Sequence, residues 1–217
     1  MLELLPNELG EVVDVGCGPG VMVEAALARG GRFSGIDVSA EMVSEGRTRF
    51  GQLENVTFAI GNIEKIGLPD ASCDQVICMG VIEYLSQAGK AMGEIARILR
   101  PGGTAIVTVP KRRHVDLLTI RALAAVRALA RRAGMSGSDQ LPRLRLQPGE
   151  LDATAAAAGL VPAGGSQYHF TPLPYPCNRL APELTMKLNL PFERWHAHRG
   201  RVRSFLAHGY VGRYRKP

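Results

Sequence analysis

The segment VVDVGCGPG, from Val12 to Gly20, constrains the fold of this chain more than any other stretch. Its valines predict a short buried strand, and its three glycines predict a tight turn into a helix that runs to Arg29. Glycines in such a turn let a polar ligand approach the backbone, and the free N–H groups at the helix start point toward that ligand. The segment therefore predicts a site for a nucleotide-like ligand.

The spacing of these glycines distinguishes between kinds of nucleotide site. A dinucleotide fingerprint requires a third glycine where this chain has Val21, and a P-loop requires a Gly-Lys-Ser/Thr ending that does not follow Gly20. NAD and ATP are therefore both disfavoured. The remaining pattern, hydrophobic-x-Asp-x-Gly-x-Gly-x-Gly, resembles the first motif of the class I S-adenosylmethionine (SAM)-dependent methyltransferases.

Three further segments resemble motifs of that family and follow in the family's order. FSGID, which ends at Asp37, resembles a strand that ends in a ribose-binding acid about 20 residues after the glycines. Cys73 to Met79 resembles the fourth strand, and LRPGG, which begins at Leu99, resembles the turn into the fifth. The motifs span residues 12–110 and look most like the methyltransferase type 11 group, which includes quinone-biosynthesis and natural-product enzymes.

The order of predicted elements indicates an α/β fold. Strand-like and helix-like segments alternate along the first half of the chain, with strands expected near Val12, Phe33, Val56, Gln75 and Thr104 and helices near Val21, Glu41 and Lys90. Such alternation predicts a parallel sheet with helices on both faces. Ser39 is a predicted helix N-cap. Because residues 209–214 resemble the family's last strand, we expect a Rossmann-like sheet with a final antiparallel strand.

The length of 217 residues favours a single domain. We expect a cofactor-binding core over residues 1–110, a basic helical insert over 111–148, and a C-terminal part over 149–217 that completes the sheet. That last part is predicted to contain a helix over 148–158 and a strand over 167–170. Unless a preceding segment is missing from this chain, residues 111–148 and 171–205 are expected to form an irregular and helical lid over the acceptor.

Charge is distributed unevenly along the chain. Residues 1–110 hold 8 lysines and arginines against 14 acidic residues, a net −6, whereas residues 111–217 hold 18 against 6, a net +12. The basic half suggests an anionic partner: a phosphate-bearing substrate, a membrane surface or a nucleic acid. The predicted amphipathic helix over 115–133 resembles, in placement and character, the membrane-touching insertion of the ubiquinone O-methyltransferases. It is expected to lie on an anionic membrane surface, to cover an apolar, anionic substrate, or to pack on the domain as an ordinary helix.

The resemblance to the methyltransferase family implies a set of residues that contact SAM. The glycines would approach the methionine part, Asp37 the ribose, and Val38 and Met42 the adenine. Asn62 stands where relatives often have an aspartate beside the adenine amine, and the alternative is a turn-forming residue. The full expected set is Asp14, Gly16, Cys17, Gly18, Gly20, Asp37, Val38, Met42, Gly61, Asn62, Ile63, Met79 and Gly80.

No catalytic residue is identified by the sequence. Methyl transfer from a sulfonium is an in-line displacement, so binding and alignment alone lower the barrier. Tyr84 follows the fourth strand where many relatives have histidine, and it is expected either to line the acceptor site or to pack. His169 and His114 are candidate general bases if the acceptor is a hydroxyl.

The expected function is methyl transfer from SAM to a small-molecule or lipid-like acceptor that is hydrophobic, anionic or both. The alternatives are an RNA-directed methyltransferase, which the lack of a recognisable RNA-binding module disfavours, and a non-catalytic SAM-binding relative.

Four cysteines without CxxC spacing predict neither a metal site nor a disulfide framework. With no secretory signal or spanning segment, we expect a cytoplasmic protein, peripheral to the membrane if residues 115–133 bind lipid.

Overall fold

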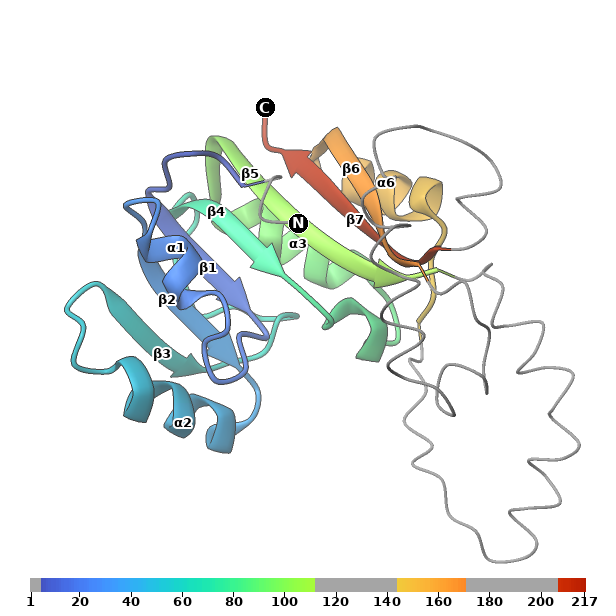
Figure 1. Ribbon diagram of the computed structural model, residues 1–217. Coiled ribbons are helices and arrows are strands. Elements are labelled where there is room, and N and C mark those ends of the chain that lie inside the picture. Colours follow the sequence, from blue (N-terminus) through green and yellow to red (C-terminus); the bar gives the residue numbers. More distant parts are fainter. Residues whose placement is uncertain (1–4, 112–143, 171–206) are drawn as a thin grey trace, which may run out of the picture.

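The computed structural model describes residues 5–111, 144–170 and 207–217, and all structural statements below concern these residues (Figure 1). The elements in chain order are β1 (Glu11–Val15), α1 (Val23–Leu27), β2 (Arg32–Asp37), α2 (Ala40–Phe50), β3 (Val56–Ile60), β4 (Cys73–Cys78), the 3-10 helix η2 (Ile82–Tyr84), α3 (Gly89–Ile98), β5 (Leu99–Pro110), α6 (Pro148–Ala157), β6 (Val161–Phe170) and β7 (Ala207–Arg215). The predicted helix over 115–133 and the second lid segment, 171–205, lie outside the described residues.

The strands form one seven-stranded sheet in the order β3-β2-β1-β4-β5-β7-β6. The pairs from β3 to β5 are parallel, and β7 pairs antiparallel with both β5 and β6. Strand order reverses between β1 and β4, because β2 and β3 extend the sheet on one side of β1 and β4 begins the other. The predicted Rossmann-like fold with a final antiparallel strand is therefore confirmed.

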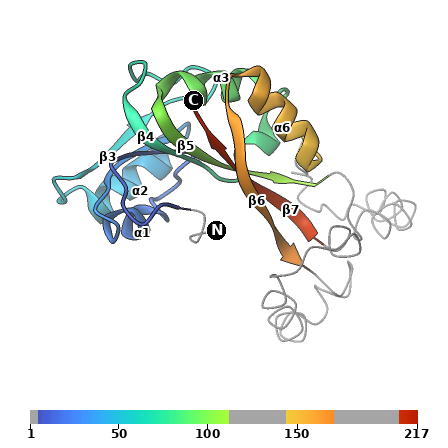
Figure 2. The same cartoon turned by 90° about the horizontal axis from the view of Figure 1, so that it is seen from above.

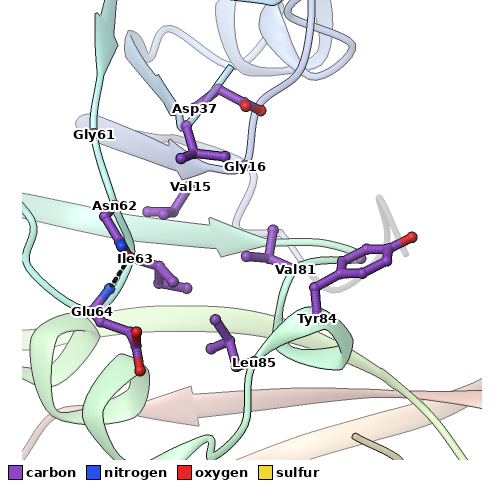
Figure 3. Close-up of a pocket in the computed structure, with 12 residues that line it drawn as sticks. Val15, Gly16, Asp37, Gly61, Asn62, Ile63, Glu64, Val81, Tyr84 and Leu85 are labelled. Atoms are coloured by element: carbon purple, nitrogen blue, oxygen red, sulfur yellow. Dashed lines mark hydrogen bonds between the residues drawn. The ribbon is translucent and has the colours of Figure 1, made fainter. Parts of the chain in front are cut away.

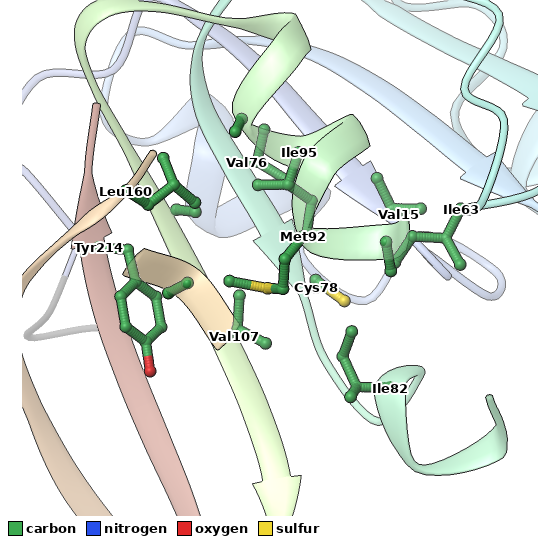
Figure 4. Close-up of a cluster of buried hydrophobic side chains, with 14 of the residues drawn as sticks. Val15, Ile63, Val76, Cys78, Ile82, Met92, Ile95, Val107, Leu160 and Tyr214 are labelled. Atoms are coloured by element: carbon green, nitrogen blue, oxygen red, sulfur yellow. The ribbon is translucent and has the colours of Figure 1, made fainter. Parts of the chain in front are cut away.

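Two hydrophobic clusters cover the two faces of the sheet. α1 and α2 pack on one face around Phe33 and Phe58, whose ring centroids are 5.8 Å apart. α3 and α6 pack on the other face, and Figure 2 shows the two pairs of helices on opposite sides. Figure 4 shows Met92 and Ile95 of α3 among side chains from β1, β4 and β5. This arrangement fixes α3 against the strands whose carboxyl ends form the site described below.

Element boundaries differ from the sequence-based predictions where tertiary pairing overrides local pattern. Ser39 is the N-cap of α2 as predicted, since its Oγ accepts a hydrogen bond from Met42 N at 3.3 Å. The predicted turn at Pro101–Gly103 instead belongs to β5, where the register with β4 shifts between Cys73 and Gln75. Lys216 N bonds the Gly103 carbonyl at 2.9 Å, so the C-terminus helps to hold this bulge.

Two further boundaries are corrected, and one predicted helix is present. β6 begins at Val161 rather than at residue 167, because its glycine-rich first half pairs with β7 through a bulge between Pro162 and Gly164. The first helix spans only Val23–Leu27, since the turn after the glycine segment takes up residues 18–22. The predicted helix over 148–158 is present as α6 and is followed by Gly159 at φ +83°.

Candidate cofactor site

A cavity of about 420 Å³ lies at the carboxyl ends of the central parallel strands (Figure 3). Its lining comes from the segments that follow β1, β2, β3 and β4, where strand order reverses. Open α/β sheets bind ligands at this switch point. The lining residues are Val15, Gly16, Asp37, Val38, Gly61, Asn62, Ile63, Glu64, Gly80, Val81, Tyr84 and Leu85.

The glycine turn after β1 forms one edge of the cavity. Gly16 N and Cys17 N donate to the Ile36 carbonyl at 2.7 and 3.2 Å, which ties the turn to β2. Gly16 has φ +76°, and a Cβ built on it would lie 2.0 Å from Val81 Cγ2. Only glycine therefore lets the turn approach the segment after β4 this closely.

Asp37, at the end of β2, connects the glycine turn to helix α2. Its Oδ2 accepts a hydrogen bond from Gly18 N at 2.9 Å, and its Oδ1 accepts one from Ser39 N at 2.9 Å. Each carboxylate oxygen has a second lone pair. The carboxylate is thus held in a fixed orientation at the cavity and keeps the capacity to accept hydrogen bonds from a ligand's hydroxyl groups.

The wall after β3 is shaped by Asn62. Its Oδ1 accepts a hydrogen bond from Glu64 N at 2.8 Å, and its backbone carbonyl accepts one from Lys65 N at 3.0 Å. The turn-forming role is therefore observed, and the same residue also lines the cavity. Contact with an adenine remains a prediction for Asn62.

The predicted cofactor residues divide into two groups. Seven of them line the cavity: Gly16, Asp37, Val38, Gly61, Asn62, Ile63 and Gly80. The other six are outside its lining: Asp14, Cys17, Gly18, Gly20, Met42 and Met79. Gly18 acts through its bond to Asp37, and Gly20 packs under Phe58, to which an added Cβ would come within 2.8 Å.

Four lining residues were not predicted from the sequence: Val15, Glu64, Val81 and Leu85. Each lies at the carboxyl end of a parallel strand or in the segment that follows it, which is the signal that could have identified them. Gly80 N donates to Thr108 Oγ1 at 2.9 Å, so β5 also fixes the segment after β4.

The catalytic candidates are in different places. Tyr84 lines the cavity and is 54 % exposed. His169 lies on β6, which β5 and β7 separate from β4. His114 lies outside the described residues. Within the described ranges, no group of three or more His, Cys, Asp or Glu residues could hold a metal ion.

Asp14 and Cys17 are buried next to the turn. Burial and, to a smaller degree, the Asp37 charge raise the pKa of Asp14 from 3.8 to about 7. Burial likewise raises the pKa of the Cys17 thiol to about 12, so the thiol is neutral. Asp14 therefore changes its charge near neutral pH, close to the cavity but outside its lining.

The raised pKa of Asp14 predicts how the stability of the fold depends on pH. Between about pH 4 and pH 7 the folded chain binds a proton at Asp14 that the unfolded chain has lost, so the free energy of unfolding should fall as pH rises. In Asp14→Asn the free energy of unfolding is expected not to fall over this pH range. Urea unfolding at several pH values measures it. Glu54→Gln, at an exposed acid, is the control. Equal slopes in wild type and Asp14→Asn would contradict the assignment.

Together, the sheet order, the glycine turn and the switch-point cavity define a Rossmann-like domain with a site for a nucleoside-type ligand. Residues 13–107 match the family described as Methyltransferase domain. Over these residues the chain is similar to SAM-dependent methyltransferases.

Individual relatives agree with this family. The chain is 34% identical over 102 residues to a probable SAM-dependent methyltransferase of Mycolicibacterium smegmatis, covering 47% of this chain and 38% of that protein. It is 29% identical over 165 residues to a ubiquinone biosynthesis O-methyltransferase of Hydrogenovibrio crunogenus, covering 75% and 66%. A SAM-dependent methyltransferase structure from Mesorhizobium loti shares the fold at TM-score 0.67 and 17% identity, covering 99% and 94%.

The chain spans well under half of the length of several curated relatives. The chain aligns with 35% to 40% of the length of several curated relatives. The fold and the similarity to methyltransferase domains are therefore shown, whereas the activity, substrates and partners of this chain are matters of proposal. No helix among the described residues is long and apolar enough to cross a membrane.

Proposed function

We propose that this domain binds SAM in the switch-point cavity and transfers its methyl group to a small-molecule acceptor. The observation that carries the proposal is the charge of the cavity. Asp37 and Glu64 are acidic, and none of the described lining residues is lysine or arginine. SAM has a net positive charge, from a sulfonium and an ammonium against one carboxylate, whereas NAD and ATP carry phosphates that favour cationic partners.

The arrangement supports catalysis by binding and alignment. When SAM is bound, its sulfonium sulfur carries the methyl group that is transferred. The rest of the cofactor then leaves as a neutral thioether. Asp37 is oriented to accept hydrogen bonds from ribose hydroxyls, and the glycine turn allows close backbone approach. Correct alignment alone contributes up to about 7–11 kcal/mol in favourable cases. The role of the residues around the cavity is therefore to orient SAM and the acceptor and to exclude water.

The acceptor is proposed to approach from the apolar side of the cavity. Val81, Tyr84 and Leu85 all follow β4, and Figure 3 shows Leu85 at the end opposite Asp37. An aromatic ring and two aliphatic side chains favour a hydrophobic acceptor. The relatives named for ubiquinone biosynthesis and demethylmenaquinone methylation are compatible with such an acceptor.

The finer predictions about the acceptor side concern other parts of the chain. An anionic or lipid-like acceptor and membrane contact through residues 115–133 rest on the basic C-terminal half. A lid from residues 111–148 and 171–205 stays a prediction. A mass-spectrometric screen for a 14-dalton gain across metabolites, lipids and RNA tests the acceptor class. A gain on RNA alone would favour the RNA-directed alternative, and binding of SAM with no gain on any acceptor would favour a non-catalytic relative.

Calorimetry with SAM, S-adenosylhomocysteine, ATP and NAD tests the cofactor directly. We expect SAM and S-adenosylhomocysteine to bind and the two phosphate-bearing nucleotides to bind far more weakly. Binding of ATP or NAD in preference to SAM would overturn the proposal.

Glu64 is expected to favour the cationic cofactor over its neutral product. A unit charge about 6 Å from another in water gains about 0.7 kcal/mol, so Glu64→Gln should weaken SAM about threefold and leave S-adenosylhomocysteine nearly unchanged. The measured quantity is the ratio of the two dissociation constants at low salt. Glu54→Gln removes an equal charge from an exposed loop and should not change the ratio. An equal loss for both ligands would assign Glu64 a purely structural role.

A further inference from the structure

The crossover between β3 and β4, residues 61–72, forms one wall of the cavity and contains no helix. Its first four residues, Gly61 to Glu64, line the cavity. Within the crossover, Asn62 accepts the hydrogen bonds from Glu64 N and Lys65 N described above. A segment of this length without regular structure needs contacts from other elements to hold one conformation, because ordering each residue costs about 1–2 kcal/mol of backbone entropy.

Arg97, on the last turn of α3, supplies several of these contacts. Its Nη2 donates to the Ile66 carbonyl at 2.8 Å. Its Nη1 donates to the Leu68 carbonyl at 2.8 Å and to Asp70 Oδ1 at 2.7 Å. One guanidinium therefore bonds three successive points of the crossover, each two residues apart.

Glu94, one turn earlier on α3, completes the arrangement. Its two carboxylate oxygens accept from Arg97 Nε at 2.8 Å and Arg97 Nη2 at 2.9 Å. Oε2 also accepts from Ile66 N at 2.7 Å. The hydrogen bond from Arg97 holds the pKa of the Glu94 carboxyl below its usual range. Ile66 thus has both its N–H and its carbonyl bonded by side chains of α3.

We propose that Arg97 and Glu94 are positioning residues for the cofactor, which hold the crossover so that Gly61 to Glu64 stay in place as the cavity wall. Neither residue lines the cavity. The anchor is rigid because α3 is buried on the sheet, with Ile95 and Ile98 fully enclosed. Ile63 and Ile66 also belong to the same hydrophobic cluster as α3. The inference rests on the proposed SAM site, since that is the ligand whose affinity it predicts.

Arg97→Ala is the direct test. If the fraction of molecules with an ordered wall falls to about one tenth, the apparent dissociation constant rises about tenfold. SAM and S-adenosylhomocysteine should lose the same factor, unlike the unequal effect expected for Glu64→Gln. Hydrogen exchange measured by mass spectrometry should show faster exchange in residues 61–68 and little change in β1 and β2. Arg97→Lys, which offers one ammonium for the same acceptors, should recover only part of the affinity.

Arg100→Ala is the matched control. Arg100, at the start of β5, donates to the carbonyl of Ser72, the last residue of the crossover, at 3.0 Å and to Asp74 Oδ2 on β4 at 2.8 Å. These contacts lie at the amino end of β4, away from the cavity wall. Arg100→Ala is expected to leave SAM affinity within about twofold of wild type and exchange in residues 61–66 unchanged.

The outcomes separate this inference from the proposed function. If wild type binds SAM and folded Arg97→Ala binds it as Arg100→Ala does, the positioning role is overturned. If wild type does not bind SAM, the proposed function fails, and exchange in residues 61–68 still decides whether Arg97 holds the crossover. If Arg97→Ala does not fold, Arg97→Lys and Glu94→Gln provide the same comparison, and unchanged affinity and exchange in both would contradict the inference.

Discussion

Replacing Asp37 with alanine is expected to weaken SAM binding about 12- to 150-fold. The substitution removes a charged hydrogen-bond acceptor, and such bonds contribute about 1.5–3 kcal/mol. The same carboxylate holds Gly18 N and Ser39 N, so the glycine turn also loses a support when the acid is removed. Calorimetric titration with SAM measures the loss, and circular dichroism establishes that the variant is folded.

Two further variants separate the roles of Asp37. Asp37→Asn keeps the shape and one acceptor oxygen and should bind SAM with intermediate affinity. Ser39→Ala removes the N-cap of α2, which costs about 1 kcal/mol of stability, and leaves the Asp37 carboxylate in place. Ser39→Ala should therefore lose stability without a comparable loss of affinity. An unchanged affinity in folded Asp37→Ala would remove Asp37 from the site.

Local sequence was sufficient for the half of the site that follows β1 and β2. The valines of β1 are buried on both faces of the sheet, as expected of a central parallel strand, although Asp14 interrupts them. The glycines and Asp37 follow such strands directly, and residue type and spacing indicate where they lie. In the structure Gly16 and Asp37 line the cavity, whereas Gly18 and Gly20 lie outside its lining.

The other half of the site depends on contacts between distant segments. Glu64 reaches the cavity because Asn62 turns the chain and because Arg97 holds Ile66, and no periodic pattern in the sequence signals either contact. Met42 and Met79 were expected at the cofactor and are outside the cavity lining. Met79 instead packs against the hydrophobic cluster on the α1 and α2 face.

The strands near the C-terminus show a similar dependence on pairing. VPAGG, at the start of β6, has two glycines and a proline and reads as a turn by composition. It forms a strand because β7 offers hydrogen-bonding partners along its length, from Val161 opposite Arg215 to Phe170 opposite Ala207. An edge strand with a bulge tolerates such residues, whereas a central strand does not.

Gly16→Ala is expected to destabilise the domain strongly. Its φ of +76° costs a non-glycine residue about 1–2 kcal/mol, and the new Cβ would meet Val81 Cγ2 at 2.0 Å. Relief of such a contact by small shifts costs about a further 1–3 kcal/mol. Gly30→Ala is the matched control, since Gly30 has φ +70° and an added Cβ there meets nothing within 4 Å. Gly30→Ala should show the backbone cost alone.

The contact with Val81 can be tested by removing the atom that clashes. In the double variant Gly16→Ala/Val81→Ala the Cγ atoms are absent, so the packing part of the loss should be recovered and the backbone part should remain. Free energies of unfolding for both single variants and the double variant give the coupling, which is expected to be favourable by about 1–3 kcal/mol. Additive losses would show that the turn moves away from Val81 and that close approach is not why residue 16 is glycine. With favourable coupling, SAM affinity should recover together with stability, because the same contact joins the glycine turn to the segment after β4 that lines the cavity.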